Sequence, residues 1–356
     1  MKILFTDATL LHGGAERVIS ILANELIELG YEVEILLYYD RPIWYQISNK
    51  VKLLNDEHFI GKTNPVNHIV FRHNYFKNCD ADIIISFLAP INMLNITANF
   101  FTGKKLIVAD RNDPRKIPVK FWIRKVRDVL YRFADGIVLQ STNNKKYFSK
   151  SIQEKSAVIF NPVDVGDFRG AALVSSKNDE IVAVGRLIEQ KNPFMLLEAF
   201  SKISYKYPTY SLTFYGEGDL ASELKQRAKE LGLSGKIKFP GAVKDVFDKI
   251  KSAKIYVMTS NYEGMPNALI EAMCVGVPVI STKVSGAVDL IEDGVNGRLV
   301  DCKDTEALIE VLDEMLDNYT MAENYAKESI KLNEKLEAKQ IVENWLEFIA
   351  RVIKHK

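Results

Sequence analysis

Two carboxylates carry the strongest chemical signal in this sequence, Glu263 and Glu271 in the stretch SNYEGMPNALIE. Besides Glu271, the polar side chains in the apolar run 266–280 are Asn267 and, at most, Cys274. A carboxylate in so apolar a segment costs on the order of several kcal/mol unless it is paired or hydrogen-bonded. A nucleotide ribose would satisfy Glu271, because two neighbouring hydroxyls can both donate to one carboxylate.

Glu263 precedes a predicted helix in which Pro266 is expected as the first residue. Gly264 would let backbone amides approach a phosphate closely, and the helix N-terminus favours an anion. Glu263 would then lie where the sugar beyond the phosphates is held. A second interpretation stays open, in which Glu271 pairs with a buried arginine and Glu263 is a solvated loop residue.

Two cations bracket another strand-to-helix loop, Arg186 and Lys191. The pair Asn192-Pro193 is expected to open the next helix, with a capping side chain followed by a first-turn proline. An arginine fork and a compact lysine charge can together neutralise a leaving diphosphate without a metal. The alternative is that both are solvated loop cations.

Glycines mark two more such turns. The turn YGEGDL contains Gly216 and is expected to use Asp219 as an N-cap, but it has no complete G-x-G-x-x-G pattern for a nicotinamide or flavin cofactor. Near the N-terminus, His12 precedes Gly13 and Gly14, which would permit backbone approach to a phosphate or an acceptor. A lone histidine such as His12 is more often structural.

These loops need parallel sheets to position them, and the chain alternates strands with helices as such sheets require. Strands are predicted in the first half at 2–5, 31–38, 83–87, 106–109 and 136–140, and in the second half at 181–184, 211–215, 236–239, 255–258, 277–281 and 298–300. The pattern restarts beyond 168–170, and 175–179 reads as a polar linker. We therefore predict two Rossmann-like α/β domains whose sheets face each other across a ligand cleft.

Composition excludes several classes of protein. The chain has 356 residues and 47% hydrophobic content, and 47 Lys plus Arg against 46 Asp plus Glu give no overall attraction to nucleic acid. Its three cysteines, Cys79, Cys274 and Cys302, are widely spaced and predict neither disulfides nor a zinc ribbon. A reducing cytoplasm is expected. The first residues read as a strand rather than a signal peptide, and no apolar run reaches about 18 residues.

The motifs together resemble the family 4 retaining glycosyltransferases, which have the GT-B fold. The resemblance spans nearly the whole chain, and its motifs are GGAER at 13–17, FNPVD at 160–164, VGRL at 184–187, KNP at 191–193, GEG at 216–218, the pair Glu263 and Glu271, and GVPVI at 276–280 through Asn296-Gly297. The finer resemblance is to bacterial enzymes that extend lipid-linked or polysaccharide glycans, including N-acetylgalactosaminyl transferases acting on undecaprenyl diphosphate sugars.

The resemblance implies an acceptor domain at 1–168, joined by a C-terminal helix at 340–356, and a donor-binding domain at 172–339. It also implies retention of configuration and a donor that is a nucleotide sugar, with UDP favoured. Predicted catalytic residues are Glu263, Arg186 and Lys191. Predicted donor-binding residues are Gly13, Gly14, Gly185, Arg186, Lys191, Gly216, Gly241, Glu263, Gly264, Met265, Pro266, Asn267 and Glu271.

No cofactor and no metal are expected, since such enzymes usually need none and the second half is almost without histidine. The Asp80-x-Asp82 pair matches the metal motif of the other major glycosyltransferase fold, but it stands before an apolar strand. Two rival functions stay open. The first is an enzyme of the same fold: an epimerase would need acid-base pairs near the sugar, and a phosphorylase would need a pyridoxal cofactor. The second is a non-catalytic nucleotide-sugar-binding protein, which could retain the same motifs.

The acceptor side departs from the family, because the sequence DRNDP at 110–114 stands where many relatives carry a histidine. We predict acceptor contacts there and on the basic helix that follows; the candidates are His12, Arg111, Asp113, Arg124 and Arg127. Residues 104–132 hold ten basic and three acidic residues. The expected partners are a glycan or undecaprenyl-diphosphate-linked acceptor and an anionic membrane surface.

The helix predicted around 118–134 has an apolar stripe, made of Val119, Trp122, Ile123, Val126, Val129, Leu130 and Phe133. Two interpretations remain open. The helix lies against anionic lipid or a lipid diphosphate, or it packs its stripe on the core and exposes its charges to water.

Overall fold

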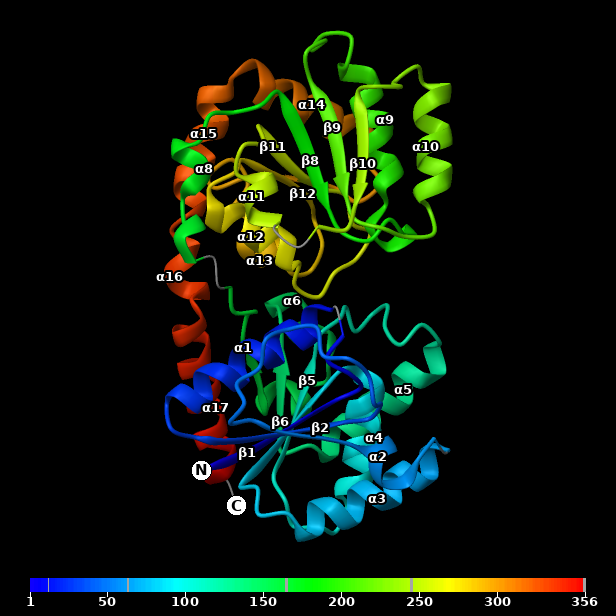
Figure 1. Cartoon of the computed structure of the whole chain (residues 1–356), viewed down its shortest axis with the longest axis vertical. Coiled ribbons are helices and arrows are strands. Elements are labelled where there is room, and N and C mark those ends of the chain that lie inside the picture. Colours follow the sequence, from blue (N-terminus) through cyan, green and yellow to red (C-terminus); the bar gives the residue numbers. More distant parts are fainter. Residues whose placement is uncertain (12, 63, 164–165, 244–245, 355–356) are drawn as a thin grey trace. The chain divides into compact units, whose positions relative to one another are not determined.

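The computed structural model describes residues 1–11, 13–62, 64–163, 166–243 and 246–354. The chain forms two compact units (Figure 1): unit 1 is Met1–Pro162 with Leu336–Lys356, and unit 2 is Val163–Lys335. The division thus falls a few residues before the predicted boundary at 168. The last helix belongs to unit 1, as the GT-B prediction expects.

Unit 1 is a seven-stranded parallel sheet in the order β3-β2-β1-β4-β5-β6-β7. Its elements are β1 (Lys2–Asp7), α1 (Gly14–Glu28), β2 (Glu32–Leu37), β3 (Lys52–Asn55), α2 (Asp56–Ile60), α3 (Pro65–Asn78), β4 (Ile83–Phe87), α4 (Ala89–Asn99), β5 (Leu106–Asp110), α5 (Phe121–Leu130), η1 (Tyr131–Phe133), β6 (Gly136–Leu139), α6 (Thr142–Tyr147), α7 (Lys150–Glu154), β7 (Ser156–Val158) and α17 (Ala338–Lys354).

Alternation along the strands of unit 1 builds two cores. Ile3 and Phe5 pack with α1 and α17 on one face, whereas Leu4 packs with α3, α4 and η1 on the other. Strands buried on both faces explain why their sequences are continuous apolar runs. The α1 helix ends as predicted, with Gly30 at φ 83° just beyond its C-cap.

Unit 2 is a six-stranded sheet in the order β10-β9-β8-β11-β12-β13, with parallel pairing throughout. Its elements are η2 (Gly166–Phe168), α8 (Ala171–Val174), β8 (Glu180–Val184), η3 (Glu189–Lys191), α9 (Pro193–Ile203), β9 (Ser211–Tyr215), α10 (Ala221–Glu230), β10 (Ile237–Gly241), α11 (Val246–Ile250), β11 (Ile255–Met258), α12 (Asn267–Val275), β12 (Val279–Thr282), α13 (Ala287–Leu290), β13 (Arg298–Val300), α14 (Thr305–Asp317), α15 (Tyr319–Ser329) and α16 (Leu332–Leu336), which runs across the division.

The two faces of the unit 2 sheet carry different helices. Helices α9, α10 and α14 pack on one face around Phe200, Leu224 and Leu312. Helix α12 contacts α8, α11 and α15. Helix α9 follows β8 and helix α12 follows β11. Two adjacent strands are therefore followed by helices that belong to different helix layers.

Candidate functional site

Some of the predicted donor residues follow two neighbouring strands of unit 2: Gly185, Arg186 and Lys191 come after β8, and Glu263 and Gly264 come after β11. The strand order reverses between these two strands, and open parallel sheets bind ligands at such a reversal. A small cavity of about 30 Å³ lies there, with Val184 and Gly185 on one side and Val257 and Met258 on the other. The loops after β8 and β11 are therefore neighbours.

A cation and a carboxylate meet across these loops. The Lys191 Nζ lies 2.6 Å from Glu263 Oε1, and the Ser260 hydroxyl donates to the same oxygen at 2.8 Å. Gln190 Nε2 reaches the other oxygen at 3.4 Å. Glu263 is buried, whereas Lys191 is partly exposed. The lysine end of the pair is therefore accessible to solvent.

Further hydrogen bonds fix the spacing of the two loops. The Thr259 hydroxyl lies 3.1 Å from the carbonyl oxygen of Lys191 and 2.9 Å from that of Asn192. The Asn261 backbone N–H donates to Gln190 O at 2.7 Å, and its side chain donates to the Glu189 carbonyl at 2.8 Å. These hydrogen bonds connect the loop after β8 directly to the loop after β11.

Arg186 is exposed beside this pair. It follows Gly185, whose φ is 152° and where an added Cβ would lie 3.3 Å from Lys191 Cε. At Gly216, φ 147°, a Cβ would overlap the Gly185 carbonyl. These two glycines keep the turn open around the lysine stem. Gly241, whose φ is 85°, accepts a hydrogen bond from the Gly216 N–H at 2.9 Å.

Three expected helix starts need correction. Helix α12 starts at Asn267, with Pro266 at the N-cap rather than inside the helix. Pro193 does open α9, but Asn192 has left-handed dihedrals instead of the extended conformation of a side-chain cap. Leu220 rather than Asp219 is the N-cap of α10. In the last two cases a turn bonded to the neighbouring loop replaces the side-chain cap, since Leu220 N donates to Leu187 O.

Glu271 is buried on α12, 4% exposed. Two neighbouring groups have raised pKa values, for which burial is the first cause and the Glu271 charge the second. These groups are Tyr256 and Cys274, and the pKa of Cys274 is raised to about 12. Glu263 also contributes to the Tyr256 shift, so the Tyr256 ring lies near both carboxylates. The Tyr256 hydroxyl is buried and has no hydrogen-bond partner in the described part of the chain.

Sequence reasoning missed several residues of this site. Ser260 and Gln190 touch Glu263, and each stands beside a predicted residue without a motif of its own. Gly286 lies against the loop at 264–266, where a Cβ would overlap the Gly264 carbonyl. Its only signal was a glycine next to a short helix, which is too common to single out.

Comparisons with known proteins identify the family of the chain. Residues 166–332 match the family model described as Glycosyl transferases group 1. The chain is 32% identical over 365 residues to a Campylobacter jejuni protein named GalNAc-alpha-(1->4)-GalNAc-alpha-(1->3)-diNAcBac-PP-undecaprenol alpha-1,4-N-acetyl-D-galactosaminyltransferase, covering 99% of both. The chain is a group 1 glycosyltransferase.

A second Campylobacter jejuni relative, N-acetylgalactosamine-N,N'-diacetylbacillosaminyl-diphospho-undecaprenol 4-alpha-N-acetylgalactosaminyltransferase, is 26% identical and matches 88% of this chain and 89% of its own. Among solved structures, Anabaena Alr3699/HepE in complex with UDP and glucose has a TM-score of 0.82 at 20% identity, covering 98% of this glycosyltransferase and 99% of its own chain. Sucrose-phosphate synthase from Thermosynechococcus elongatus has a TM-score of 0.85 at 15% identity, with full coverage of both chains. The predicted GT-B fold is confirmed.

The first-unit loop of the glycosyltransferase is less open to an anion than predicted. Gly13 is the N-cap of α1 and Gly14 its first residue. A Cβ on Gly13 would overlap the Glu16 carboxylate, which therefore lies over the helix N-terminus. A phosphate at this N-terminus would have to displace that carboxylate. His12 lies outside the described residues.

Arg111 is buried at the carboxyl edge of the unit 1 sheet. Its guanidinium donates to Asn161 and lies 5.6 Å from the Phe87 ring, and burial lowers the pKa of Arg111 to about 9. Within the described ranges, Nε and Nη1 of Arg111 have no hydrogen-bond partner. A ligand oxygen there would stabilise the charge.

Asp113 forms a turn instead of facing outward. Its carboxylate accepts from the Arg115 N–H at 2.9 Å, and its carbonyl accepts from the N–H groups of Lys116 and Ile117. The structure gives it a turn-forming role, and an acceptor contact stays a prediction.

The two arginines predicted on the basic helix are both bonded to neighbouring groups, Arg127 in the core and Arg124 with partial exposure. Arg127 is fully buried and donates to Ile117 O at 2.6 Å, Pro114 O at 3.0 Å and Asp128 Oδ1 at 2.8 Å. Arg124 donates to the carbonyls of Pro118 and Val119 at 2.9 and 2.7 Å. Their predicted acceptor contacts are untested, but both side chains are already engaged.

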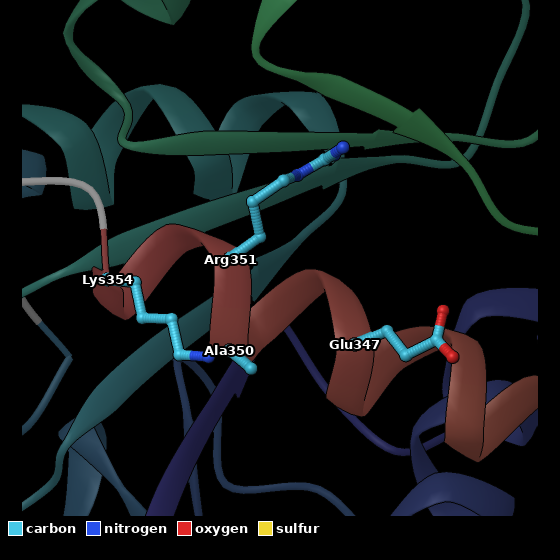
Figure 2. Close-up of a pocket in the computed structure, with 4 residues that line it drawn as sticks. All are labelled: Glu347, Ala350, Arg351 and Lys354. Atoms are coloured by element: carbon cyan, nitrogen blue, oxygen red, sulfur yellow. The ribbon is translucent and has the colours of Figure 1, made fainter.

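Another hollow lies on α17 of the glycosyltransferase. Its walls are Glu347, Ala350, Arg351 and Lys354, and Figure 2 shows their side chains spread along one helix instead of converging. Because these four side chains do not converge on one position where a ligand could bind, the β8/β11 edge is the better candidate site.

Across the described ranges, no three His, Cys, Asp or Glu side chains gather as a metal site would require. Asp80 pairs with Lys2 Nζ at 2.5 Å, and Asp82 accepts from the Lys2 backbone N–H. The helices described include none with the length and apolar character of a membrane span.

Proposed function

We propose that this glycosyltransferase moves an N-acetylhexosamine from a UDP-sugar to a lipid-diphosphate-linked glycan, with retention of configuration and without a metal. The names of two relatives that match most of the chain support this donor sugar and acceptor class. The observation that carries the donor assignment is the 2.6 Å contact between Lys191 and Glu263 at the strand-order reversal.

In the proposed reaction the bond between the sugar C1 and the donor diphosphate breaks, and the acceptor hydroxyl oxygen forms the new bond to C1. UDP leaves with the bonding electron pair, and the proton of the hydroxyl passes to the departing diphosphate oxygen. Lys191 and Arg186 neutralise the charge that grows on the diphosphate, which lowers the barrier more than it strengthens donor binding.

The carboxylates hold the rest of the donor. Glu263 accepts from a hydroxyl of the donor sugar, and Glu271 on α12 accepts from the ribose hydroxyls. Lys191 and Ser260 both contact the Glu263 carboxylate. These contacts support a position for the cation where the sugar and the diphosphate of the donor meet.

The proposed acceptor class supports a site of action at a membrane. A glycan on a lipid diphosphate keeps its lipid in the bilayer, so we infer that the protein works as a peripheral protein at the cytoplasmic face, in assembly of a cell-surface glycan. The nucleotide sugar would reach it from solution.

The test is release of UDP from a panel of nucleotide sugars, with and without undecaprenyl-diphosphate-linked acceptors. We expect acceptor-dependent release with a UDP-N-acetylhexosamine, unchanged by EDTA, and an axial product linkage by NMR. Release without acceptor, or epimerised donor, would point to the rival activities. Loss of activity in EDTA, restored by a divalent cation, would contradict the metal-free mechanism.

A further inference from the structure

Helix α5 exposes the apolar side chains that a helix normally buries. The α5 apolar face consists of Val119 (77% exposed), Phe121 (64%), Trp122 (62%), Val126 (44%), Val129 (51%) and Phe133 (60%). Trp122, Val126, Val129 and Phe133 follow at intervals of four, three and four residues, so they form one stripe. Figure 1 shows α5 at the periphery of unit 1, where it contacts α4.

The patch extends beyond the helix. Phe133 stacks edge-on with Phe100 at 5.3 Å between ring centroids, and Phe100 contacts Phe101 at 6.3 Å. Phe101 is 98% exposed. A contiguous set of large exposed apolar side chains of this kind marks an interaction surface.

The orientation of the helix is fixed by an arginine on its inner side. Arg127 is fully buried and is held by two backbone carbonyls and by Asp128. Its Nη1 also lies 3.8 Å from the buried Asp110 carboxylate. Turning the stripe inward would remove Arg127 from all of these partners, which is costly for a buried charge. The apolar face is therefore held outward.

The charges around the face have one sign. Lys116, Lys120, Lys125 and Arg132 are exposed along the same segment. The carboxylate within 114–134, Asp128, is engaged by Arg127 and by the Tyr147 hydroxyl at 3.2 Å. Exposed lysines beside exposed aromatic rings match the two layers of an anionic bilayer surface, with its phosphates outside and its acyl chains below.

We infer that the α5 apolar face docks on an anionic lipid bilayer, with Trp122 and Phe121 entering the interfacial layer and the lysines on the lipid phosphates. The inference rests on the proposed function only in giving a reason for the enzyme to stay at the membrane. It explains why a helix would bury an arginine and leave a tryptophan in solvent.

The test is sedimentation of the full chain with vesicles of phosphatidylcholine containing phosphatidylglycerol, beside vesicles of phosphatidylcholine alone. We expect binding to the anionic vesicles that salt weakens. The double variant F121A/W122A should lower vesicle affinity about tenfold or more, and K120E/K125E should lower it too. Tyr205→Ala, which removes an exposed ring (84%) of unit 2, is the matched control and should not change it.

Fluorescence separates insertion from mere adsorption. Trp122 and Trp44 are exposed and Trp345 is buried. Vesicles should shift the emission to the blue in the wild type and in Trp44→Phe, but not in Trp122→Phe, which keeps the apolar side chain.

Three results would overturn the inference: no binding of the wild type, unchanged binding of F121A/W122A, or a dimer in solution that F121A/W122A dissolves, since a second copy would then cover the face. UDP release on a short-chain acceptor in detergent should survive in F121A/W122A. Its failure in the wild type would count against the proposed function and leave the docking result standing.

Discussion

The carboxyl edges of the two sheets differ in how far their cationic side chains are exposed to solvent. At the β8/β11 edge of unit 2, Arg186 is exposed and Lys191 partly so, and the Glu263 carboxylate is paired. At the edge of unit 1, Asp7, Asp110 and Arg111 are buried, and burial raises the pKa of both aspartates and lowers that of the arginine.

The difference suggests two tasks. Cations with solvent access can approach a diphosphate without first being drawn out of the protein interior. Buried charges instead hold loops in place, as Arg127 does for the segment before α5. Arg111 is a different case, because two of its nitrogens have no hydrogen-bond partner among the described residues. We therefore propose that the unit 2 edge binds an anion and the unit 1 edge a neutral or weakly charged partner.

The largest effect is expected from removing a buried structural charge. Arg127→Ala should destabilise unit 1 by about 3–5 kcal/mol, because it leaves Asp110 without its nearest cation. All three tryptophans, Trp44, Trp122 and Trp345, lie in unit 1, so tryptophan fluorescence in urea reports its unfolding. Arg124→Ala is the control and should cost about 1 kcal/mol. Equal losses in both variants would mean that Arg127 is no more structural than Arg124.

Next in size is the loss of the donor pair. Glu263→Ala and Lys191→Ala should each lower kcat about 100- to 1000-fold, with a smaller change in donor binding for Glu263→Ala. Glu189→Ala changes an exposed carboxylate on the same loop and should stay within about threefold. Steady-state UDP release measures all three. Near-normal turnover in both pair variants would remove the pair from the mechanism.

A middle-sized effect is expected at Arg111. Its two unpartnered nitrogens suggest a ligand oxygen from the acceptor side, so Arg111→Ala should raise the acceptor KM about tenfold with donor KM unchanged. Arg111→Lys should not restore it, because lysine lacks the planar fork. If only urea stability changes, Arg111 is a structural residue.

The smallest effect concerns pH. Burial, and then Glu16, raise the pKa of Asp7 well above that of an ordinary carboxyl, while Arg72 and Arg111 act against this. A carboxyl whose pKa is higher when folded contributes stability below its unfolded pKa and loses it as pH rises through the folded value. Asp7→Asn should remove that loss, gaining about 1 kcal/mol at neutral pH. Urea curves across pH check this, and parallel profiles for both proteins would refute it.

Much of the fold was predictable from local pattern. The strands at 83–87, 211–215, 255–258 and 298–300 were predicted with the bounds observed, because runs buried on both faces leave continuous apolar sequence. The strands β3 and β7 were missed: Lys52–Asn55 is an edge strand whose first two residues are exposed, and Ser156–Val158 is three residues long. Neither produces a periodic signal.

The candidate site was predictable in its residues but not in its contacts. Glu263 and Lys191 were recognised from residue type and loop position, whereas their pairing depends on β8 and β11 being neighbours, which only the strand order shows. The α5 stripe illustrates a second limit. Periodicity predicts that the face exists, but the direction it points is decided by the partners of Arg127, which come from a loop before the helix.

Calorimetric titration of UDP into the wild type, Lys191→Ala and Arg111→Ala tests the contrast between the two edges most directly. The account predicts that UDP binds the wild type, that Lys191→Ala weakens it about tenfold or more, and that Arg111→Ala leaves it unchanged. UDP binding that is lost in Arg111→Ala and kept in Lys191→Ala would contradict it, because the diphosphate would then lie on unit 1.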